Sequence, residues 1–238
     1  MKVFTGAACH ALLVQIGVLG ATGPAGRGIA ARLASLGYEV LAGSRALERS
    51  ESAVLALQEK WGNKVKTLFP VDNDSAANCE MVIVATNWEA AVDTTILYSS
   101  ALAGRTVIAM ANGLEKVGQE FRPVIPPEGS LSAAIQAAAP EAKVVAAFQH
   151  IPASTFAALD KKMEGDVVVC GDDDDARNVV LDLVASMPDL RGFDAGSLVN
   201  AVGIETFAAD LLSINLRHKG KGTLRFLGLE GYLPEANR

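Results

Sequence analysis

A cluster of glycines near the start of the chain has the spacing of a phosphate-binding turn. Within GVLGATGPAGRG, residues 21–26 match the Gly-x-Gly-x-x-Gly pattern of dinucleotide-binding turns, with alanine at the first glycine position. Gly23 would let the backbone approach a phosphate, Gly26 would let the following helix pack closely, and Thr22 adds a hydroxyl donor. Pro24 suits the first turn of a helix, where its missing N–H costs nothing. Because an apolar run precedes the turn and a helical pattern follows it, a pyrophosphate-binding turn is favoured over a plain glycine bend.

The residues at the end of the second expected strand indicate which dinucleotide binds. NAD enzymes usually place Asp or Glu there to bind the ribose 2′-hydroxyl, and a carboxylate would repel a 2′-phosphate. This chain has Gly43, Ser44 and Arg45 at that point, and Arg49 follows one helical turn later. A hydroxyl and two guanidinium groups can bind a 2′-phosphate through charge-assisted hydrogen bonds, so the pattern predicts NADP rather than NAD. A solvated basic helix start is less favoured, since cations near a helix N-terminus need an anion to bind.

The elements that must position these residues alternate between strand-like and helix-like patterns. The chain has 238 residues, 50% of them hydrophobic, and a mean hydropathy of +0.26, so it can bury a substantial core. Continuous apolar strands separated by helices indicate a parallel sheet covered on both faces. We therefore expect a Rossmann-type doubly wound α/β domain over residues 16–152, an N-terminal extension over 1–15 and a small C-terminal α/β domain over 153–238. The expected strands cover residues 12–19, 38–45, 65–71, 79–86, 105–112, 143–150, 166–170 and 190–196, and the expected helices cover 24–36, 47–61, 88–102, 176–187 and 198–218.

Composition argues against several classes of partner. The net charge of −6 gives no overall cationic field for nucleic acid or an anionic membrane. The three cysteines and three histidines show no zinc spacing, so we expect reduced thiols, no metal and a cytoplasmic location. No apolar run approaches the ~20 residues that span a bilayer, and the N-terminal apolar run leads straight into the glycine turn, which disfavours a cleaved signal. The acidic run at 171–175 precedes an expected helix, and we expect its carboxylates to cap that helix.

Side chains for acid–base catalysis are scarce. None of Tyr38, Tyr98 and Tyr232 has a lysine four residues further on, and no acid–base pair stands near a strand end. His150 ends an expected strand, where ligands of this fold bind, and could either position a ligand or act as an acid. Two redox rings held face to face would need no strong side-chain acid, because the cofactors carry the chemistry.

Several motifs together resemble those of the F420-dependent NADP oxidoreductases, which exchange a hydride between NADP and the deazaflavin coenzyme F420. The motifs are GATGPAGRG, GSR with Arg49, TNWEAAVD (86–93), HIPA (150–153), and VCGDDDDA followed by DAGSL (194–198). The resemblance covers nearly all of residues 16–228 and implies NADPH:F420 oxidoreductase activity. It also implies a homodimer, in which the apolar face of the last helix could pack against a second subunit or within the chain.

The resemblance implies a set of cofactor-binding residues. The first turn would bind the NADP pyrophosphate, and Ser44, Arg45 and Arg49 would bind the 2′-phosphate. Residues after the fourth and fifth expected strands would line the nicotinamide side, and the HIPA turn would lie between nicotinamide and deazaflavin. Leu224 would close the deazaflavin pocket, although it and Trp88 could equally be packing residues. The full set is Gly20, Thr22, Gly23, Pro24, Ala25, Gly26, Ser44, Arg45, Arg49, Thr86, Asn87, Trp88, Asn112, Leu114, His150, Ile151, Pro152, Ala153 and Leu224.

The sequence departs from the family pattern in two places and leaves two other functions open. Ala21 stands where the family commonly has glycine, which is tolerable only at negative φ, and the loop MANGLE (110–115) is less apolar than in some relatives. An NADP-dependent reductase of a small imine or carbonyl metabolite, similar to pyrroline-carboxylate reductases, is one alternative. Those enzymes usually carry an all-helical second domain, whereas strands are expected here after residue 152. A non-catalytic NADP-sensing domain is the other alternative.

Overall fold

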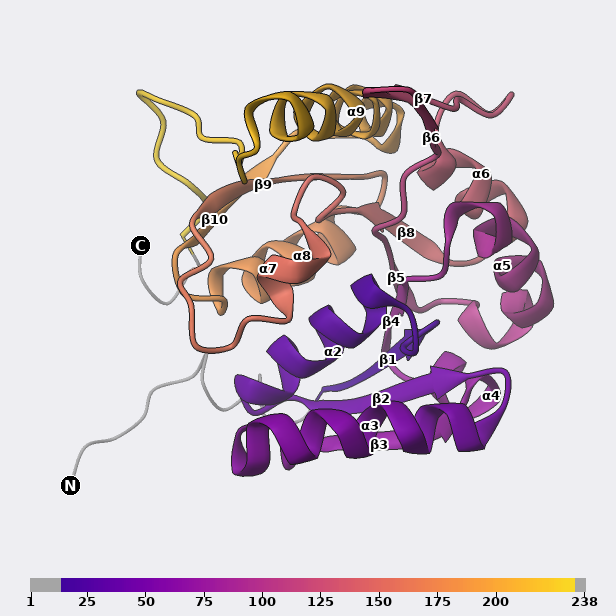
Figure 1. Cartoon of the computed structure of the whole chain (residues 1–238). Coiled ribbons are helices and arrows are strands. Elements are labelled where there is room, and N and C mark those ends of the chain that lie inside the picture. Colours follow the sequence, from indigo (N-terminus) through magenta and orange to yellow (C-terminus); the bar gives the residue numbers. More distant parts are fainter. Residues whose placement is uncertain (1–13, 234–238) are drawn as a thin grey trace.

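The computed structural model describes residues 14–233, and its centre is one eight-stranded sheet in the order β10-β9-β8-β5-β4-β1-β2-β3 (Figure 1). Neighbouring strands are parallel except β8 and β9, which pair antiparallel. The predicted Rossmann-type sheet is therefore confirmed, while the expectation of a purely parallel sheet is wrong at this one joint. An apolar strand pattern reports burial on both faces and is silent on strand direction. The strands are β1 (Gln15–Leu19), β2 (Glu39–Ser44), β3 (Leu68–Asp72), β4 (Met81–Val84), β5 (Thr106–Ala109), β8 (Lys143–Ala146), β9 (Gly165–Gly171) and β10 (Leu190–Asp194).

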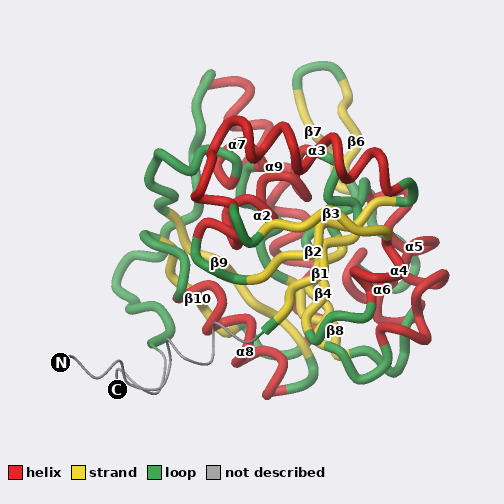
Figure 2. Tube along the Cα trace, turned by 90° about the horizontal axis from the view of Figure 1, so that it is seen from below, coloured by secondary structure: helices red, strands yellow, loops and turns green. Residues whose placement is uncertain are grey.

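Helices cover both faces of the sheet, as Figure 2 shows from a second direction. One face carries α2 (Pro24–Ser35), α3 (Leu47–Trp61), α7 (Ala153–Phe156) and α8 (Asp174–Ala185), and the other carries α4 (Asn73–Ala77), α5 (Trp88–Leu102) and α6 (Leu131–Ala138). The long helix α9 (Ala201–His218) runs along the top of Figure 1, packed against α6 and the strand β7. A separate hairpin of β6 (Leu114–Val117) and β7 (Glu120–Pro123) projects from the main sheet (Figure 2). Two short 3-10 turns, Gly62–Val65 and Leu198–Asn200, complete the order.

Alternation along the central strands builds one hydrophobic core on each face. In β4, Met81 and Ile83 belong to the core under α2 and α3, whereas Val82 and Val84 belong to the core under α5 and α6. This alternation is the side-chain period of two that every strand has, with both faces covered. The sheet is thus held rigidly between two buried layers, and the loops at its carboxyl edge start from fixed points.

The first helix forms where the glycine turn predicts it. Pro24 occupies the first turn of α2, and Gly37 follows the C-terminal cap residue with a φ of 95°, a conformation that favours glycine. The observed bounds of α3 and α5 match the expected ranges 47–61 and 88–102. Helices α4, α6 and α7 and the β6–β7 hairpin were not predicted, because they are short and lie in stretches without a clear hydrophobic period.

Residues after 152 extend the same sheet through β9 and β10. The proposed division of the chain at residue 152 stays a prediction. The strands on either side of that residue, β8 and β9, are hydrogen-bonded neighbours within one sheet. The expected extension lies almost wholly outside the described residues, since the description starts at residue 14 and β1 starts at Gln15. In the part of the chain that the structure describes, no helix is long and apolar enough to cross a membrane.

Candidate functional site

The carboxyl ends of β1 and β4 lie side by side where the strand order reverses, the usual ligand crevice of such sheets. The loop after β1 begins at Gly20, whose φ is 81°, and a Cβ there would lie 2.9 Å from the Cα of Thr86. Helix α2 then starts at Pro24, its N-cap residue Gly23 supplies no side-chain cap, and its first turn holds no acidic residue. Its free amides and the positive end of its dipole are therefore available to an anion.

The glycines of the turn serve different purposes. A Cβ on Gly26 would lie 2.4 Å from the Gly20 carbonyl oxygen, so the close packing of α2 requires glycine there. A Cβ on Gly23 would meet only that same oxygen, at 3.5 Å, an ordinary contact. The protein's own packing thus leaves room in front of Gly23. Ala21 is buried and is not among the described non-glycine residues with positive φ, so the condition for tolerating its methyl group is met.

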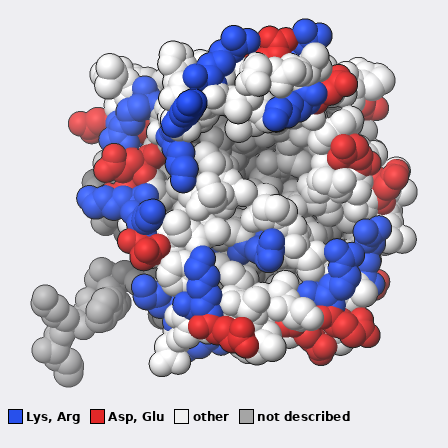
Figure 3. Space-filling model, in the orientation of Figure 1, with Lys and Arg blue, Asp and Glu red and all other residues white. Residues whose placement is uncertain are grey.

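A cavity of about 350 Å³ opens beside the start of α2. One side is formed by the α2 start and the loops after β4, β5 and β8, and the other side is formed by α9. Figure 3 shows this face of the molecule hollowed beneath α9, with walls that are largely free of charged side chains. The lining residues are Ala25, Thr86, Asn87, Trp88, Met110, Ala111, Asn112, Leu114, Phe148, Gln149, His150, Ile151, Pro152, Ala153, Ala208, Leu211, Leu212 and Asn215.

Buried polar atoms without a partner gather at this cavity. They belong to Thr86 (Oγ1), Asn112 (Oδ1), Gln149 (Oε1) and His150 (Nδ1), all of which are lining residues. Buried polar groups are normally hydrogen-bonded, so such a cluster calls for an explanation. A ligand that brings N–H or O–H donors into the cavity would satisfy these acceptors.

His150 is fixed in one orientation and stays neutral. It is 4% exposed, and its Nε2 is hydrogen-bonded to the backbone carbonyl of Asp166. A carbonyl only accepts, so Nε2 carries the proton and Nδ1 is left as an acceptor. Burial lowers the pKa of His150, although the contact with Asp166 acts to raise it. Of the residues lining the cavity, His150 is the one titratable side chain.

The loop after β8 is also strained where it enters the cavity. Phe148 is buried and has a φ of 73°, which is unusual for a bulky residue, and its ring packs edge-on against Phe156 at 5.6 Å. Strained backbone is retained where surrounding packing enforces it, and it often marks functional loops. Here it turns the chain so that Gln149 and His150 both reach the cavity wall.

A second cavity of about 450 Å³ lies at the start of α3. Arg49 is in its lining, as is Thr22 of the glycine turn. Ser44, at the end of β2, is buried and Arg45 is exposed, and neither of them lines this cavity. The complete lining is Thr22, Arg27, Glu48, Arg49, Ser52, Ala53 and Ala56.

The glycine turn connects the two cavities. Thr22 lines the second and Ala25 lines the first, so only Gly23 and Pro24 lie between these two lining residues in the chain. An elongated ligand with phosphates at its middle could cross the uncapped helix end and place one end in each cavity.

The structure brings most of the predicted residues to these cavities, with exceptions. Gly20, Gly23, Pro24 and Gly26 shape the turn without lining either space. Leu224 lies outside both linings, and its carbonyl accepts a hydrogen bond from the backbone of β9 at 3.0 Å.

Sequence reasoning missed part of the lining. Arg27 could have been found, because it is a cation within the glycine motif itself. Gln149 could also have been found, as the polar neighbour of His150. The α9 residues could not, since apolar residues that face a ligand have the same helical spacing as core residues. The missed residues are Arg27, Glu48, Ser52, Ala53, Ala56, Met110, Ala111, Phe148, Gln149, Ala208, Leu211, Leu212 and Asn215.

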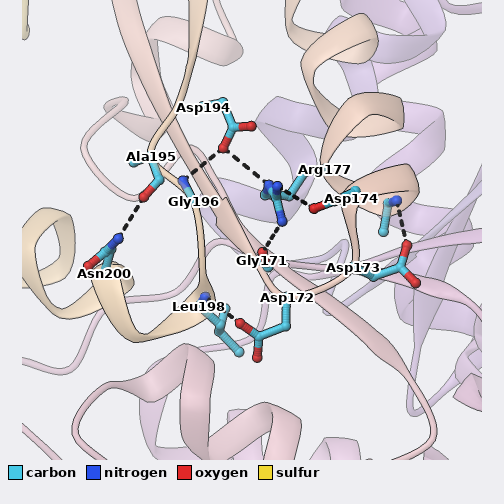
Figure 4. Close-up of polar contacts among 11 residues, drawn as sticks. Gly171, Asp172, Asp173, Asp174, Arg177, Asp194, Ala195, Gly196, Leu198 and Asn200 are labelled. Atoms are coloured by element: carbon cyan, nitrogen blue, oxygen red, sulfur yellow. Dashed lines mark hydrogen bonds and ion pairs between the residues drawn. The ribbon is translucent and has the colours of Figure 1, made fainter.

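The acidic run after β9 caps the following helix, as the sequence predicts, and also binds the backbone at Leu198 (Figure 4). Asp173 caps α8, accepting a backbone N–H of its first turn at 2.8 Å, and Asp172 accepts the backbone N–H of Leu198 at 2.9 Å. Asp174 pairs with Arg177 at 2.5 Å. Among the residues that the structure describes, no group of three or more His, Cys, Asp or Glu is placed to hold a metal ion.

Comparison with known proteins gives consistent matches. The family model described as NADP oxidoreductase, coenzyme F420-dependent, matches residues 15–113. An F420-dependent NADP reductase of Methanocaldococcus jannaschii is 31% identical over 223 residues, which cover 91% of this chain and 100% of the relative. A protein of the same name from Methanothermobacter marburgensis is 30% identical over 215 residues, or 87% of this chain and 94% of the relative. The crystal structure of a putative F420-dependent NADP-reductase from Arthrobacter sp. FB24 superposes with a TM-score of 0.75 at 27% identity, covering 91% of this chain and 100% of that one.

Proposed function

The chain belongs to the family of coenzyme F420-dependent NADP oxidoreductases, and on that basis we propose that it transfers a hydride between NADP(H) and coenzyme F420. The enzyme uses NADP and F420 as its cofactors. When bound, the nicotinamide and deazaflavin rings supply the hydride chemistry. The observation that carries this function is a cavity lined by unpartnered acceptors, in which a neutral histidine is the one titratable side chain of the lining.

The residues around the glycine turn fit NADP. The uncapped start of α2 would receive the pyrophosphate, with the open space in front of Gly23 as its place. Arg49 would hold the 2′-phosphate from the second cavity, assisted by Arg45 and Ser44 at the end of β2. Arg27 shares that cavity with Arg49, and we assign it to the same phosphate.

The first cavity, beneath α9, fits the two rings. Its acceptors suit the carboxamide N–H groups of nicotinamide and the ring N–H groups of a deazaflavin. Trp88, Leu114 and the 150–153 turn supply apolar and backbone surface that excludes water from the reacting rings. His150 orients a ring through its unprotonated Nδ1, which leaves the lining with no side chain to deliver a proton.

The two alternative functions are not favoured. Reduction of a small imine or carbonyl calls for a proton donor near the substrate. The one titratable side chain of the lining is neutral His150, whose N–H is already donated in a hydrogen bond to the Asp166 carbonyl. A cofactor-sensing domain needs no second ring site. The similarity to F420-dependent NADP reductases extends over 91% of this chain, and so beyond the nucleotide-binding half.

Mixing the full chain with NADPH and oxidised F420 tests the activity. Loss of the deazaflavin's visible absorbance is expected with NADPH, and reduced F420 with NADP⁺ should restore it. A folded protein that binds NADPH, shown by fluorescence titration, yet leaves F420 oxidised would refute the proposed function.

Three cationic side chains are expected to discriminate between the cofactors. Arg27→Ala, Arg45→Ala and Arg49→Ala should each weaken NADPH binding by about 1–3 kcal/mol, or roughly 5- to 150-fold, because each removes a charge-assisted hydrogen bond. Binding of NADH should change little. Lys66→Ala, an exposed change outside both cavities, is the control. Equal losses for NADPH and NADH would contradict the assignment of that side chain to the 2′-phosphate.

We also infer a homodimer. Leu211 and Leu212 of the apolar α9 face line the cavity within the chain, so they do not support it. The inference rests on the family resemblance, and the exposed side chains of Val199 and Leu97, at 73% and 70%, are residues that a second subunit could cover. Light scattering coupled to gel filtration should give twice the 24.8 kDa chain mass. A mass of one chain at micromolar concentration would exclude the dimer.

A further inference from the structure

Asp166, at the start of β9, is a fully buried carboxylate outside the cavity lining. Arg191 on β10 donates to it from Nε and Nη2, each at 2.7 Å. The backbone N–H of Phe226, in the C-terminal tail (residues 219–233), donates to Oδ2 at 2.5 Å. Burial acts to raise the pKa of Asp166, but these hydrogen bonds and the charges of Arg191 and Arg225 outweigh it and lower the pKa. The carboxylate is therefore charged and paired at neutral pH.

The same ion pair anchors the tail by its backbone. The Asp166 N–H donates to the carbonyl of Leu224 at 3.0 Å. Arg191 donates from Nη1 to the carbonyl of Leu229 and from Nη2 to the carbonyl of Phe226, each at 2.8 Å. The tail has no helix or strand of its own, so these contacts to one buried pair replace the hydrogen bonds of regular structure.

The tail contacts the wall of the first cavity, beneath α9, at Asn215 and approaches it near Gly165. The Gly222 N–H donates to Asn215 Oδ1 at 2.5 Å, Asn215 Nδ2 donates back to the Gly222 carbonyl at 3.2 Å, and Asn215 lines the cavity. Thr223 and Ile151 converge over Gly165, each within 3.7 Å of the place where its Cβ would be. Ile151 also lines the cavity, so the tail lies close to a second part of the lining at Gly165.

We propose that Asp166 is a positioning residue for hydride transfer. Its backbone holds a residue of the cavity wall in place, and its side chain holds the tail beside that wall. Its carbonyl fixes His150 through Nε2. Its carboxylate, with Arg191, keeps the tail against the cavity wall. The kinetic part of this proposal rests on the proposed function, whereas the structural part does not.

The tail contact is tested by proteolysis of the full chain. Lys219, Lys221 and Arg225 are exposed trypsin sites within the tail. Asp166→Asn removes the charge and one acceptor oxygen, so tail cleavage should accelerate at least about tenfold, as expected for losing a charge-assisted bond. Asp194→Asn makes the same chemical change at the far end of the β9–β10 pair, away from the tail, and should cleave like the wild type.

A second variant tests the same tail contact in case Asp166→Asn does not fold. Removing one partner of a buried pair is often strongly destabilising, but Phe226→Ala leaves that pair intact. It deletes only the edge-on contact of the Phe226 and Phe193 rings, whose centroids are 5.0 Å apart. Both variants should release the tail by the same assay.

The kinetic readout separates positioning from general damage. With a loosened tail, KM for F420 should rise about tenfold, the size of one lost charge-assisted contact. The Kd for NADPH should change less, because its phosphate groups are assigned to the glycine turn and the second cavity, whose lining holds no tail residue. Wild-type cleavage and wild-type KM in both variants would overturn the proposal, as would an equal loss of NADPH affinity. If the wild type itself fails to reduce F420, the proposed function fails, and tail cleavage still decides the structural part.

Discussion

Replacing Glu205 with alanine should destabilise the protein, although this residue touches neither cavity. Glu205 lies on α9 with 7% of its surface exposed, and it caps a different helix, α6. Its Oε2 accepts the Leu131 N–H at 2.7 Å, and its Oε1 accepts the Ser132 N–H at 2.9 Å and the Ser132 hydroxyl at 2.6 Å. One carboxylate from a distant part of the chain thus satisfies the first two amides of α6.

The expected loss follows from those three bonds. Each buried donor left without an acceptor costs about 1–3 kcal/mol. Water entering the vacated space recovers part of this loss. Deleting the carboxylate also removes its own desolvation cost, the largest cause of the raised pKa of Glu205, against which the Ser132 and Leu131 hydrogen bonds act. We therefore expect the free energy of unfolding to fall by about 2–4 kcal/mol.

Urea unfolding followed by tryptophan fluorescence measures this change. Glu205→Gln keeps one acceptor and the shape of the side chain, so its loss should fall between alanine and wild type. Asp210→Ala, an exposed acidic position on the same helix, should change stability by less than about 0.5 kcal/mol. The reasoning is refuted if Glu205→Ala costs no more than Asp210→Ala.

Two further predictions concern pH and the glycine turn. Burial lowers the pKa of His150. As pH falls below about 6.5, the imidazole is therefore protonated in the unfolded chain more readily than in the folded chain, and the free energy of unfolding decreases. His150→Asn should flatten this dependence in urea titrations at pH 5–7, and a slope equal to that of the wild type would contradict the prediction. Gly26→Ala should lower the melting temperature, because its Cβ would lie 2.4 Å from the Gly20 carbonyl oxygen. Gly23→Ala, with its nearest contact at 3.5 Å, should melt like the wild type but bind NADPH more weakly, and unchanged binding would show that no phosphate approaches there.

The nucleotide-binding half was the part of the fold that the sequence predicted best. Its strands are continuous apolar runs, and its helices α2, α3 and α5 are amphipathic or clearly bounded by Pro and Gly signals, so local pattern and global fold agree. The joint between β8 and β9 could not be predicted, because strand direction depends on which neighbour is available and not on the local pattern. The hairpin after residue 113 was missed for a related reason: its two strands have only four residues each, and none of these residues is fully buried.

The candidate site divides in the same way. Cofactor-facing loops carry chemically distinctive residues such as His150 and Asn112, which sequence reasoning can place. The wall formed by α9 is made of residues such as Ala208 and Leu211 that look like any core face. Leu224 was expected to close the deazaflavin pocket, which stays a prediction; it is absent from the cavity lining, and its backbone carbonyl accepts a hydrogen bond from β9. A long-range hydrogen bond of the main chain leaves no trace in residue types.

The β6–β7 hairpin braces the cavity across its width. Leu114 begins the hairpin and lines one wall, while the Phe121 N–H donates to the hydroxyl of Ser213 on α9, the opposite wall, at 2.8 Å. Arg217 adds a second tie to Glu120 at 3.5 Å. The β6–β7 hairpin and α9 are therefore linked to each other directly, so the distance between these two walls is set by the fold before a ligand binds. The conformational entropy of ordering these walls is lost during folding and not at binding. This favours binding of flat rings over binding of thicker ligands that would require the two walls to move apart.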